Sequence, residues 1–269
     1  MAKYSVCMTC FNEFPTVRES IGSLLSQLNT EYEVVVVDNF SKDGTYEVLQ
    51  EFGRSHGVKV IQERCSRGMG RQIALENSTG EYVIANLDLD DIFLPVLQGL
   101  VAGYHRRAEG KLMAAFNSPP TPGGKAGWSQ NVTIGPRELI KSIGGWRDLN
   151  IYEDWDIWSR AARADGYRWT SLRFARNDSL PSEAKGALNR LRRRIERYRN
   201  RIRLGLVVFT PGEKVGLSQR VAYATARITS PFHPPLSGQD PGFDSFDQGL
   251  YVDLVETRGV PDLASGLLG

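Results

Sequence analysis

Strand-like and helix-like apolar patterns alternate four times within about the first ninety residues, and this alternation most restricts the fold. The predicted strands are Tyr4–Cys10, Tyr32–Val37, Val58–Gln62 and Tyr82–Leu87. Helical spacing of apolar residues predicts a helix after each of the first three strands. The pattern favours a doubly wound, mostly parallel α/β sheet. In such sheets, ligands bind beyond the carboxyl ends of the strands.

Three aspartates close the fourth strand, in the sequence EYVIANLDLDD. Alternate side chains of an extended chain point the same way, so we expect Asp88 and Asp90 on one side and Asp91 on the other. Two adjacent carboxylates repel unless a cation lies between them, and their oxygens suit Mg²⁺ or Mn²⁺. An isolated Asp-x-Asp is more often a solvated turn that caps a helix. Glu13 and Asp38 end neighbouring strands, which favours the metal site.

The composition is that of a globular protein, with 269 residues, 41% hydrophobic and 24% charged. For Cys7 and Cys10 a buried strand is favoured over a redox or metal site, because three cysteines complete neither a disulfide framework nor a metal site. The sequence contains no secretory signal and no apolar run long enough to cross a membrane, so it predicts a cytoplasmic protein. Four Asn-x-Ser/Thr sequences, one of them at Asn131, are interpreted as chance matches.

The middle of the chain is less regular. The patterns predict helices at Leu94–Arg107 and Pro136–Ile143, strands at Leu112–Phe116 and Asn131–Ile134, and a loop at Pro119–Gly127. A further helix runs through Ala164 and begins near Glu153 and Asp154. Acidic residues at a helix start suit the helix dipole, and on their own these two need no other explanation.

Five short blocks, taken together, resemble glycosyltransferase family 2 from Ser5 to about Trp169. The blocks are CFNE (10–13), VVVVDNFSKDGT (34–45), GMGRQIAL (68–75), TGEYVIANLDLDD (79–91) and GGWRDLNIYEDWDIWSRAARADG (144–166). Members of this family are inverting enzymes with a GT-A fold. The resemblance therefore implies transfer of a sugar from a nucleotide-diphosphate donor with a divalent metal, Mg²⁺ or Mn²⁺.

The resemblance also implies a role for each matching residue. Thr9, Phe11 and Glu13 would line the nucleotide pocket, although Glu13 is equally well explained by a turn next to the core. Asp38 would accept a hydrogen bond from the base, and Arg71 would neutralise the diphosphate. Asp88 would lie toward the ribose and the metal, and Asp90 on the metal. In the Glu153–Asp154 pair, Asp154 would be the catalytic base for the acceptor hydroxyl.

The sequence departs from the family pattern at three places. Asn39 replaces a frequent second aspartate, which puts some nucleoside contacts in doubt, and Thr9-Cys10 replaces a more usual Pro-Thr. The Gln-x-x-Arg-Trp motif of processive members is absent, because Arg168-Trp169 occurs without the glutamine. A single-addition enzyme is therefore favoured over a polymer synthase.

Residues 183–204 predict a helix with an apolar stripe set among arginines. Lys185 and eight arginines against Glu183 and Glu196 give this segment a net charge of +7, so the remainder of a +2 chain carries −5. The arginine-rich surface, Arg190–Arg203, either packs on the catalytic domain or contacts an anionic membrane, and both can hold together. Nucleic acid is not expected as a partner, because no pattern of stacking aromatics accompanies the charge.

The predicted organisation is a catalytic domain (1–180), an arginine-rich helical segment (181–230) that includes a second helix at 213–228, and a loosely ordered tail (231–269) with a short helix near 246–255. The predicted function is transfer of one sugar to a glycan or polyprenyl-phosphate-type acceptor by an enzyme peripheral to the cytoplasmic face of a membrane. The alternative is a non-catalytic protein that binds a nucleotide sugar or a lipid headgroup. A sugar-phosphate nucleotidylyltransferase is disfavoured, because its N-terminal glycine-rich loop and lysine are missing.

Overall fold

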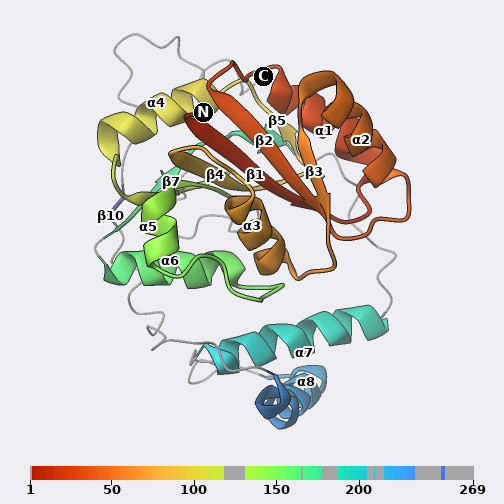
Figure 1. The fold of residues 1–269 in the computed structure, drawn as a ribbon. Coiled ribbons are helices and arrows are strands. Elements are labelled where there is room, and N and C mark those ends of the chain that lie inside the picture. The colour runs from red at the N-terminus through yellow and green to blue at the C-terminus, as the bar shows by residue number, and fades with distance from the viewer. Residues whose placement is uncertain are drawn as a thin grey trace, which may run out of the picture.

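The structure, a computed structural model, describes residues 2–117, 131–164, 166–176, 187–204, 209, 215–233 and 250–251 (Figure 1). The strands are β1 (Tyr4–Cys10), β2 (Tyr32–Asp38), β3 (Lys59–Gln62), β4 (Tyr82–Asp88), β5 (Ile92–Phe93), β6 (Leu112–Phe116), β7 (Asn131–Pro136), β8 (Tyr167–Ser171), β9 (Ala175–Arg176) and β10 (Leu250–Tyr251). The helices are α1 (Phe14–Leu25), α2 (Thr45–His56), α3 (Arg67–Glu76), α4 (Leu97–Arg107), α5 (Arg137–Ser142), α6 (Glu153–Arg163), α7 (Ala187–Arg203), α8 (Leu217–Thr229) and the 3-10 helix η1 (Ser230–Phe232).

Eight strands form one sheet in the order β10-β8-β6-β7-β4-β1-β2-β3, and β5 pairs with β9 separately. Strand β7 runs antiparallel to its neighbours β4 and β6, whereas the other neighbouring strands of this sheet are parallel. The predicted mostly parallel sheet is confirmed. Cys10 is in register with Asp38, and Thr9 with Asp88, so the carboxyl ends of β1, β2 and β4 meet at one edge.

Helices cover both faces of this sheet, as expected for a doubly wound fold (Figure 1). Helices α1, α2 and α4 pack on the face that carries Val6 and Ile84. Helices α3, α5 and α6 pack on the face that carries Cys7 and Val83. The alternation of side chains along β1 and β4 supplies both cores. Cys7 and Cys10 are buried free thiols, which fits the predicted strand setting.

Strand β4 contains one residue more than the facing part of β1. Val6 pairs with Ile84 and Met8 with Leu87, so a β-bulge lies between these pairs. Asn86, in the bulge, has a φ of 68°, a left-handed conformation that Asn tolerates better than most residues. Beyond the bulge Leu87 lies in the same core as Ile84. Asp88 is then on the opposite face, beside α3.

Two glycines, Gly68 and Gly70, lie inside helix α3. Ser66 caps the helix by accepting a hydrogen bond from the Met69 backbone N–H at 3.2 Å. A Cβ at Gly70 would lie 2.8 Å from Thr9 Cγ2, and one at Gly68 would collide with the Arg147 carbonyl. The glycines therefore allow α3 to approach both β1 and the segment that leads toward α6.

Most of the other predicted helices and strands are observed within a few residues, whereas β5, β8 and β9 had no predicted counterpart. Helix α4 begins at Leu97 and not at Leu94, because β5 pairs with β9 and the Leu94 N–H donates to the Phe174 carbonyl at 2.8 Å. The predicted helix near 246–255 is wrong at Leu250–Tyr251, which form a strand beside β8. The predicted loop 119–127 lies outside the described residues.

Helices α7 and α8 pack against each other on the side of the molecule below the sheet in Figure 1. The apolar stripe of α7 contacts α8 through a cluster of Leu191, Ile195, Tyr198, Ile202, Phe209, Ala222, Tyr223 and Ala226. The end of α7 contacts the catalytic domain where Asn200 Nδ2 donates to the Ile151 carbonyl at 3.1 Å and Leu204 packs on Leu149. The stripe therefore binds mainly a helix of the same segment. No described helix is both long enough and apolar enough to cross a membrane.

Candidate active site

The three aspartates at the end of β4 lie in a turn and differ in burial. The Asp91 N–H donates to the Asp88 carbonyl at 3.2 Å, which closes a four-residue turn. Leu89 and Asp91 are buried, whereas Asp88 and Asp90 are half-exposed. The carboxylates available to a ligand are therefore those of Asp88 and Asp90.

A divalent cation at this turn would depend on ligands from outside the protein. Among the residues that the structure describes, no three His, Cys, Asp or Glu side chains form a metal-binding group. Two half-exposed carboxylates nevertheless fit Mg²⁺ or Mn²⁺, because these ions are commonly held by one or two carboxylates together with substrate phosphates and water. The donor set fits a metal that arrives with a phosphorylated ligand.

Arg71 lies at the centre of the predicted site and joins three of its carboxylates. Its side chain is 2% exposed, and Nη1 lies 2.5 Å from Glu153 Oε1 and 2.5 Å from Asp154 Oδ1. Its Nη2 lies 3.7 Å from Asp88 Oδ1. The guanidinium thus connects the end of β4 to the start of α6, and buried charges of this kind persist only when they are paired. The Glu153–Asp154 pair is therefore more than a pair of helix-start acids.

Burial and a neighbouring acid change the protonation of Glu153. Burial, and then the charge of Asp154, raise the pKa of Glu153 to about 7, although Arg71 and Arg67 act in the opposite direction. Burial would lower the pKa of Arg71, but Asp154, Glu153 and Asp88 together raise it. Arg71 therefore stays charged, and Glu153 holds a proton more readily than an ordinary glutamate does.

Asp154 has a second contact, which the sequence did not suggest. Asn131 Nδ2 donates to Asp154 Oδ2 at 3.1 Å, and Asn131 Oδ1 accepts from Asn86 Nδ2 at 2.8 Å. Asn86 also donates to Thr133 Oγ1 at 2.8 Å, and Trp158 Nε1 donates to the same oxygen. Both asparagines are buried. The available signal was Asn86 itself, a polar residue within the apolar run of β4.

Asp38 lies where it was predicted, at the end of β2, and is fully buried. Its Oδ2 accepts hydrogen bonds from the Ser41 backbone N–H at 3.1 Å and from Gln62 Nε2 at 2.9 Å. Cys10 Sγ lies 3.5 Å from Oδ1. Asp38 thus orders the loop after β2, and its contact with a base stays a prediction.

The end of β1 and the loop after it place the three predicted residues Thr9, Phe11 and Glu13 in different settings. Phe11 is 53% exposed, and Thr9 packs against the position of Gly70. Glu13 is half-buried, and its backbone N–H donates to Thr45 Oγ1 at 2.8 Å, in keeping with a turn next to the core. Of these residues only Phe11 presents a large side chain to the neighbouring cavity.

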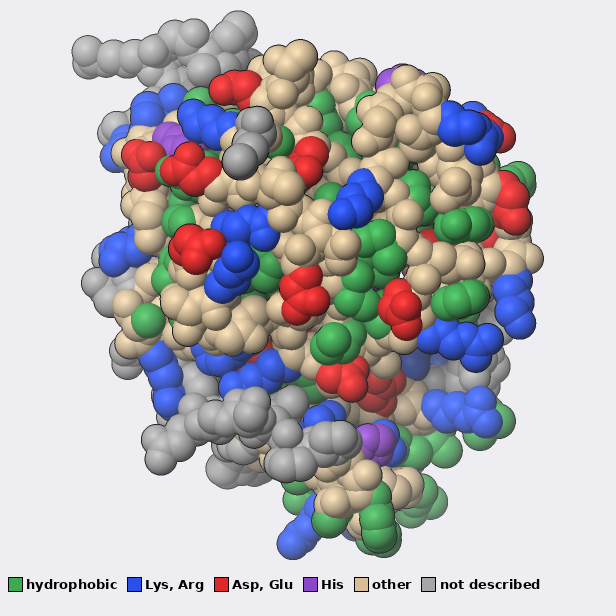
Figure 2. All heavy atoms as spheres, in the orientation of Figure 1, with side chains coloured by type: hydrophobic (Ala, Val, Ile, Leu, Met, Phe, Trp, Pro, Cys, Tyr) green, Lys and Arg blue, Asp and Glu red, His purple; other side chains and the backbone are tan. Residues whose placement is uncertain are grey.

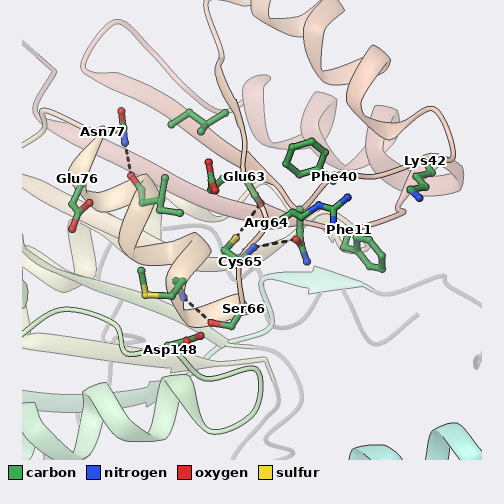
Figure 3. Close-up of a pocket in the computed structure, with 14 residues that line it drawn as sticks. Phe11, Phe40, Lys42, Glu63, Arg64, Cys65, Ser66, Glu76, Asn77 and Asp148 are labelled. Atoms are coloured by element: carbon green, nitrogen blue, oxygen red, sulfur yellow. Dashed lines mark hydrogen bonds between the residues drawn. The ribbon is translucent and has the colours of Figure 1, made fainter. Parts of the chain in front are cut away.

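A cavity of about 990 Å³ lies between the ends of β2 and β3 and helix α3 (Figure 3). The lining residues are Phe11, Asn39, Phe40, Lys42, Ile61, Glu63, Arg64, Cys65, Ser66, Met69, Ile73, Glu76, Asn77 and Asp148. Phe11, Phe40, Lys42 and Arg64 lie at one end, and Glu76 and Asn77 at the other. Arg71, Asp88 and Asp154 are not among the lining residues. The first end offers two aromatic side chains that could contact a flat ring.

The protein-family model for "Glycosyl transferase family 2" matches residues 5–168, more than half of the chain. The chain belongs to glycosyl transferase family 2. This membership agrees with the glycosyltransferase activity predicted from the sequence.

The matches to curated relatives cover different shares of this chain and of the relatives' own lengths. The putative glycosyltransferase EpsE of Bacillus subtilis is 33% identical over 64% of this chain and 71% of its own length. The poly-beta-1,6-N-acetyl-D-glucosamine synthase of Staphylococcus epidermidis is 30% identical over 33% of this chain, which spans only 22% of that protein. The UDP-Glc:alpha-D-GlcNAc-diphosphoundecaprenol beta-1,3-glucosyltransferase WfgD of Escherichia coli is 34% identical over 34% of this chain and 36% of its own length.

Solved structures share the fold. TarS 1-349 of Staphylococcus aureus, in complex with UDP, has a TM-score of 0.52 and 22% identity, and covers 64% of this chain and 59% of that one. The mannosyltransferase PcManGT of Pyrobaculum calidifontis, in complex with GDP-Man and Mn²⁺, has a TM-score of 0.55 and 20% identity, with 86% and 71% covered. The predicted GT-A fold is confirmed.

Proposed function

We propose that this glycosyltransferase moves one sugar from a nucleotide-diphosphate donor to an acceptor hydroxyl or lipid phosphate, with inversion at the anomeric carbon. The observation that carries the proposal is the position of Arg71, which contacts Asp154 and lies within ion-pair distance of Asp88. One buried cation thus links the candidate base to the candidate diphosphate site.

The donor would bind with its diphosphate at Asp88 and Asp90 and its base between Phe11 and Phe40. A Mg²⁺ or Mn²⁺ held by the two aspartates would supply positive charge for the departing nucleoside diphosphate. Arg71 would add to that charge from the protein side, since it stays protonated at any physiological pH. The complexes of related folds with UDP, or with GDP-Man and Mn²⁺, support a donor of this class.

Asp154 would remove the proton from the acceptor as its oxygen attacks the sugar. The carboxylate is half-buried, and both of its oxygens have partners, Oδ1 in Arg71 and Oδ2 in Asn131. These contacts fix the orientation of the base, and positioning of this kind accounts for much of enzymatic rate enhancement. Glu153, which is buried and holds a proton more readily, would not face the acceptor.

We propose single addition over polymerisation, because Arg168 and Trp169 lack the glutamine of the processive motif and are explained by their place in the central sheet. Both lie in strand β8 of the central sheet, and the Trp169 ring packs on Phe116 at 6.2 Å between centroids. For the acceptor we propose a glycan or a polyprenyl-phosphate-linked sugar at the cytoplasmic face of a membrane. The lipid-linked acceptor named for the WfgD relative supports this class.

Replacement of the base tests the proposal. Donors are first ranked by thermal stabilisation with UDP-, GDP- and dTDP-sugars in the presence of Mn²⁺. We expect Asp154→Asn to lower turnover of the best donor by about 10²–10⁴-fold while its stabilisation by that donor persists. Glu138→Gln, at an exposed carboxylate of α5, is the control. Unchanged turnover in Asp154→Asn would contradict the base assignment, and equal turnover with and without chelator would contradict the metal.

A further inference from the structure

Among the described residues of the α7–α8 pair, the outer face of α8 presents exposed apolar side chains. The apolar stripe of α7 is occupied by its contact with Ala222 and Ala226 on the inner face of α8. On the outer face Leu217, Val221 and Ile228 are 79%, 48% and 70% exposed. Spacings of four and seven residues place these three side chains on one side of a helix. Phe232, in the adjoining η1, is 84% exposed.

Positive charge borders this apolar face. Arg220 and Arg227 of α8 are exposed, and α8 contains no acidic residue. Arginines of α7 are tied to the same helix, because Arg194 Nη1 donates to Ser218 Oγ at 2.7 Å and Arg199 Nε to Thr229 Oγ1 at 3.2 Å. In Figure 2 green and blue side chains occur together at the end of the molecule that these helices form.

We infer that the outer face of α8 binds an anionic lipid surface, with Leu217, Val221, Ile228 and Phe232 in the acyl boundary and the arginines at the headgroups. Exposed apolar side chains bordered by arginine are the features of helices that lie in a membrane interface. Each basic residue close to an anionic surface adds to the affinity. A second copy of the chain is a poorer occupant, since the same face would bring two strongly basic helix pairs together.

This inference rests on the membrane-linked acceptor of the proposed function, but it uses none of the catalytic residues. It also revises the expected arrangement. The arginine-rich helix α7 does not itself present an apolar stripe to the membrane, and α8 supplies the apolar part. Vesicle binding should therefore be unchanged in Asp154→Asn, whereas donor hydrolysis without vesicles should be unchanged in variants of α8.

Co-sedimentation of the full chain with vesicles tests the inference, using phosphatidylcholine alone or mixed with phosphatidylglycerol, at low and high salt. We expect binding to the mixed vesicles at low salt and weak binding to phosphatidylcholine alone. Leu217→Ser/Ile228→Ser should weaken binding by about tenfold or more, because two exposed apolar side chains lose their burial. Arg220→Gln/Arg227→Gln should weaken it by about tenfold, and mainly on the anionic vesicles.

The matched control is Arg54→Gln/Arg106→Gln, which removes two exposed arginines from α2 and α4 on the opposite face of the sheet. This control should bind as the wild type does, and thermal unfolding verifies that each variant is folded. No binding of the wild type to anionic vesicles at low salt would overturn the inference. So would unchanged binding of both α8 variants, or self-association without vesicles that Leu217→Ser/Ile228→Ser abolishes.

Discussion

Arginine is used in two opposite ways in this molecule. In the candidate active site one buried arginine, Arg71, is 2% exposed and lies within 4 Å of three carboxylates. In α7 eight arginines share a helix with one glutamate, and several of them are exposed. The first arrangement compensates a charge that water does not reach, whereas the second leaves its charge to solvent and to external partners.

Burial, and not the number of charges, decides what an arginine contributes in these two regions. An ion pair removed from water is expensive to break, because its remaining partner keeps an uncompensated buried charge. An exposed arginine adds little to stability but contributes to the field that attracts anions. Four measurements test this distinction, and the largest effect is expected at the buried arginine.

Arg71→Ala should lower the free energy of unfolding by about 3–5 kcal/mol and abolish transfer, because Glu153 and Asp154 would lose the cation between them. Urea unfolding measures the change. Arg18→Ala is the control, since Arg18 forms an ion pair of the same 2.5 Å length with Glu51 but is 61% exposed. Its effect should stay below about 1 kcal/mol. Equal effects of the two substitutions would show that burial does not separate the two classes of arginine.

Glu153→Gln tests the raised pKa of Glu153 through the pH dependence of stability. Because the pKa of Glu153 is about 7 in the folded protein and near its ordinary value of 4.5 when unfolded, the folded state binds this proton more tightly. The stability that the proton on Glu153 contributes is complete below about pH 4.5 and is lost as pH rises through about 7. The variant should therefore gain stability relative to the wild type between pH 5 and 8, by at most about 3 kcal/mol. Urea unfolding of the variant and the wild type at pH 5 and at pH 8 measures this gain. If the difference in their free energies of unfolding were the same at both pH values, the raised pKa of Glu153 would be refuted.

Asn131→Ala should lower kcat by about tenfold and leave the KM for the donor unchanged, because Asp154 would lose one of the two contacts that orient it. Steady-state kinetics measure both constants. Asn131→Asp is the comparison variant, and it should be worse because it places a like charge beside the base. A fall in donor affinity with constant kcat would assign Asn131 to binding.

Arg192→Gln/Arg193→Gln, at two exposed positions of α7, should change Tm by less than about 2 °C. The same variant should weaken binding to anionic vesicles modestly, because charge near the surface contributes to the affinity. Differential scanning fluorimetry and co-sedimentation measure the two effects. A large fall in Tm would show that these arginines stabilise the fold.

The sequence predicted the elements whose signal is local. Strands β1 to β4 and helices α1 to α3 follow from apolar periodicity, and so does α7. The two-residue strands β5 and β9 were missed, because their pairing joins Phe93 to Ala175 across a long stretch of chain. For the same reason the sequence did not show which surface the apolar stripe of α7 contacts. Such a stripe can pack on α8 or on the catalytic domain, and its sequence pattern is the same in both cases.

The candidate site was predictable as a set of positions but not as a set of contacts. The blocks identified Arg71, Asp88 and Asp154, and the structure brings these three together. The contact of Arg71 with Asp154 depends on how closely α3 approaches the segment that leads to α6, and Gly68 allows that approach. Asn131 was interpreted as one of the chance glycosylation matches, because nothing in its neighbourhood showed that it would face Asp154.

The bulge in β4 has a consequence for which substitutions the site tolerates. Side chains on a regular strand alternate between faces, so four regular steps from Ile84 would return Asp88 to the face of Ile84. The left-handed residue Asn86 absorbs one of these steps and directs Asp88 to the α3 side, where Arg71 lies. A β-branched residue such as Val at position 86 would resist that conformation and favour a regular strand, with the carboxylate turned toward the α1 side. The orientation of a carboxylate in the donor site therefore depends on the backbone of a residue two positions before it.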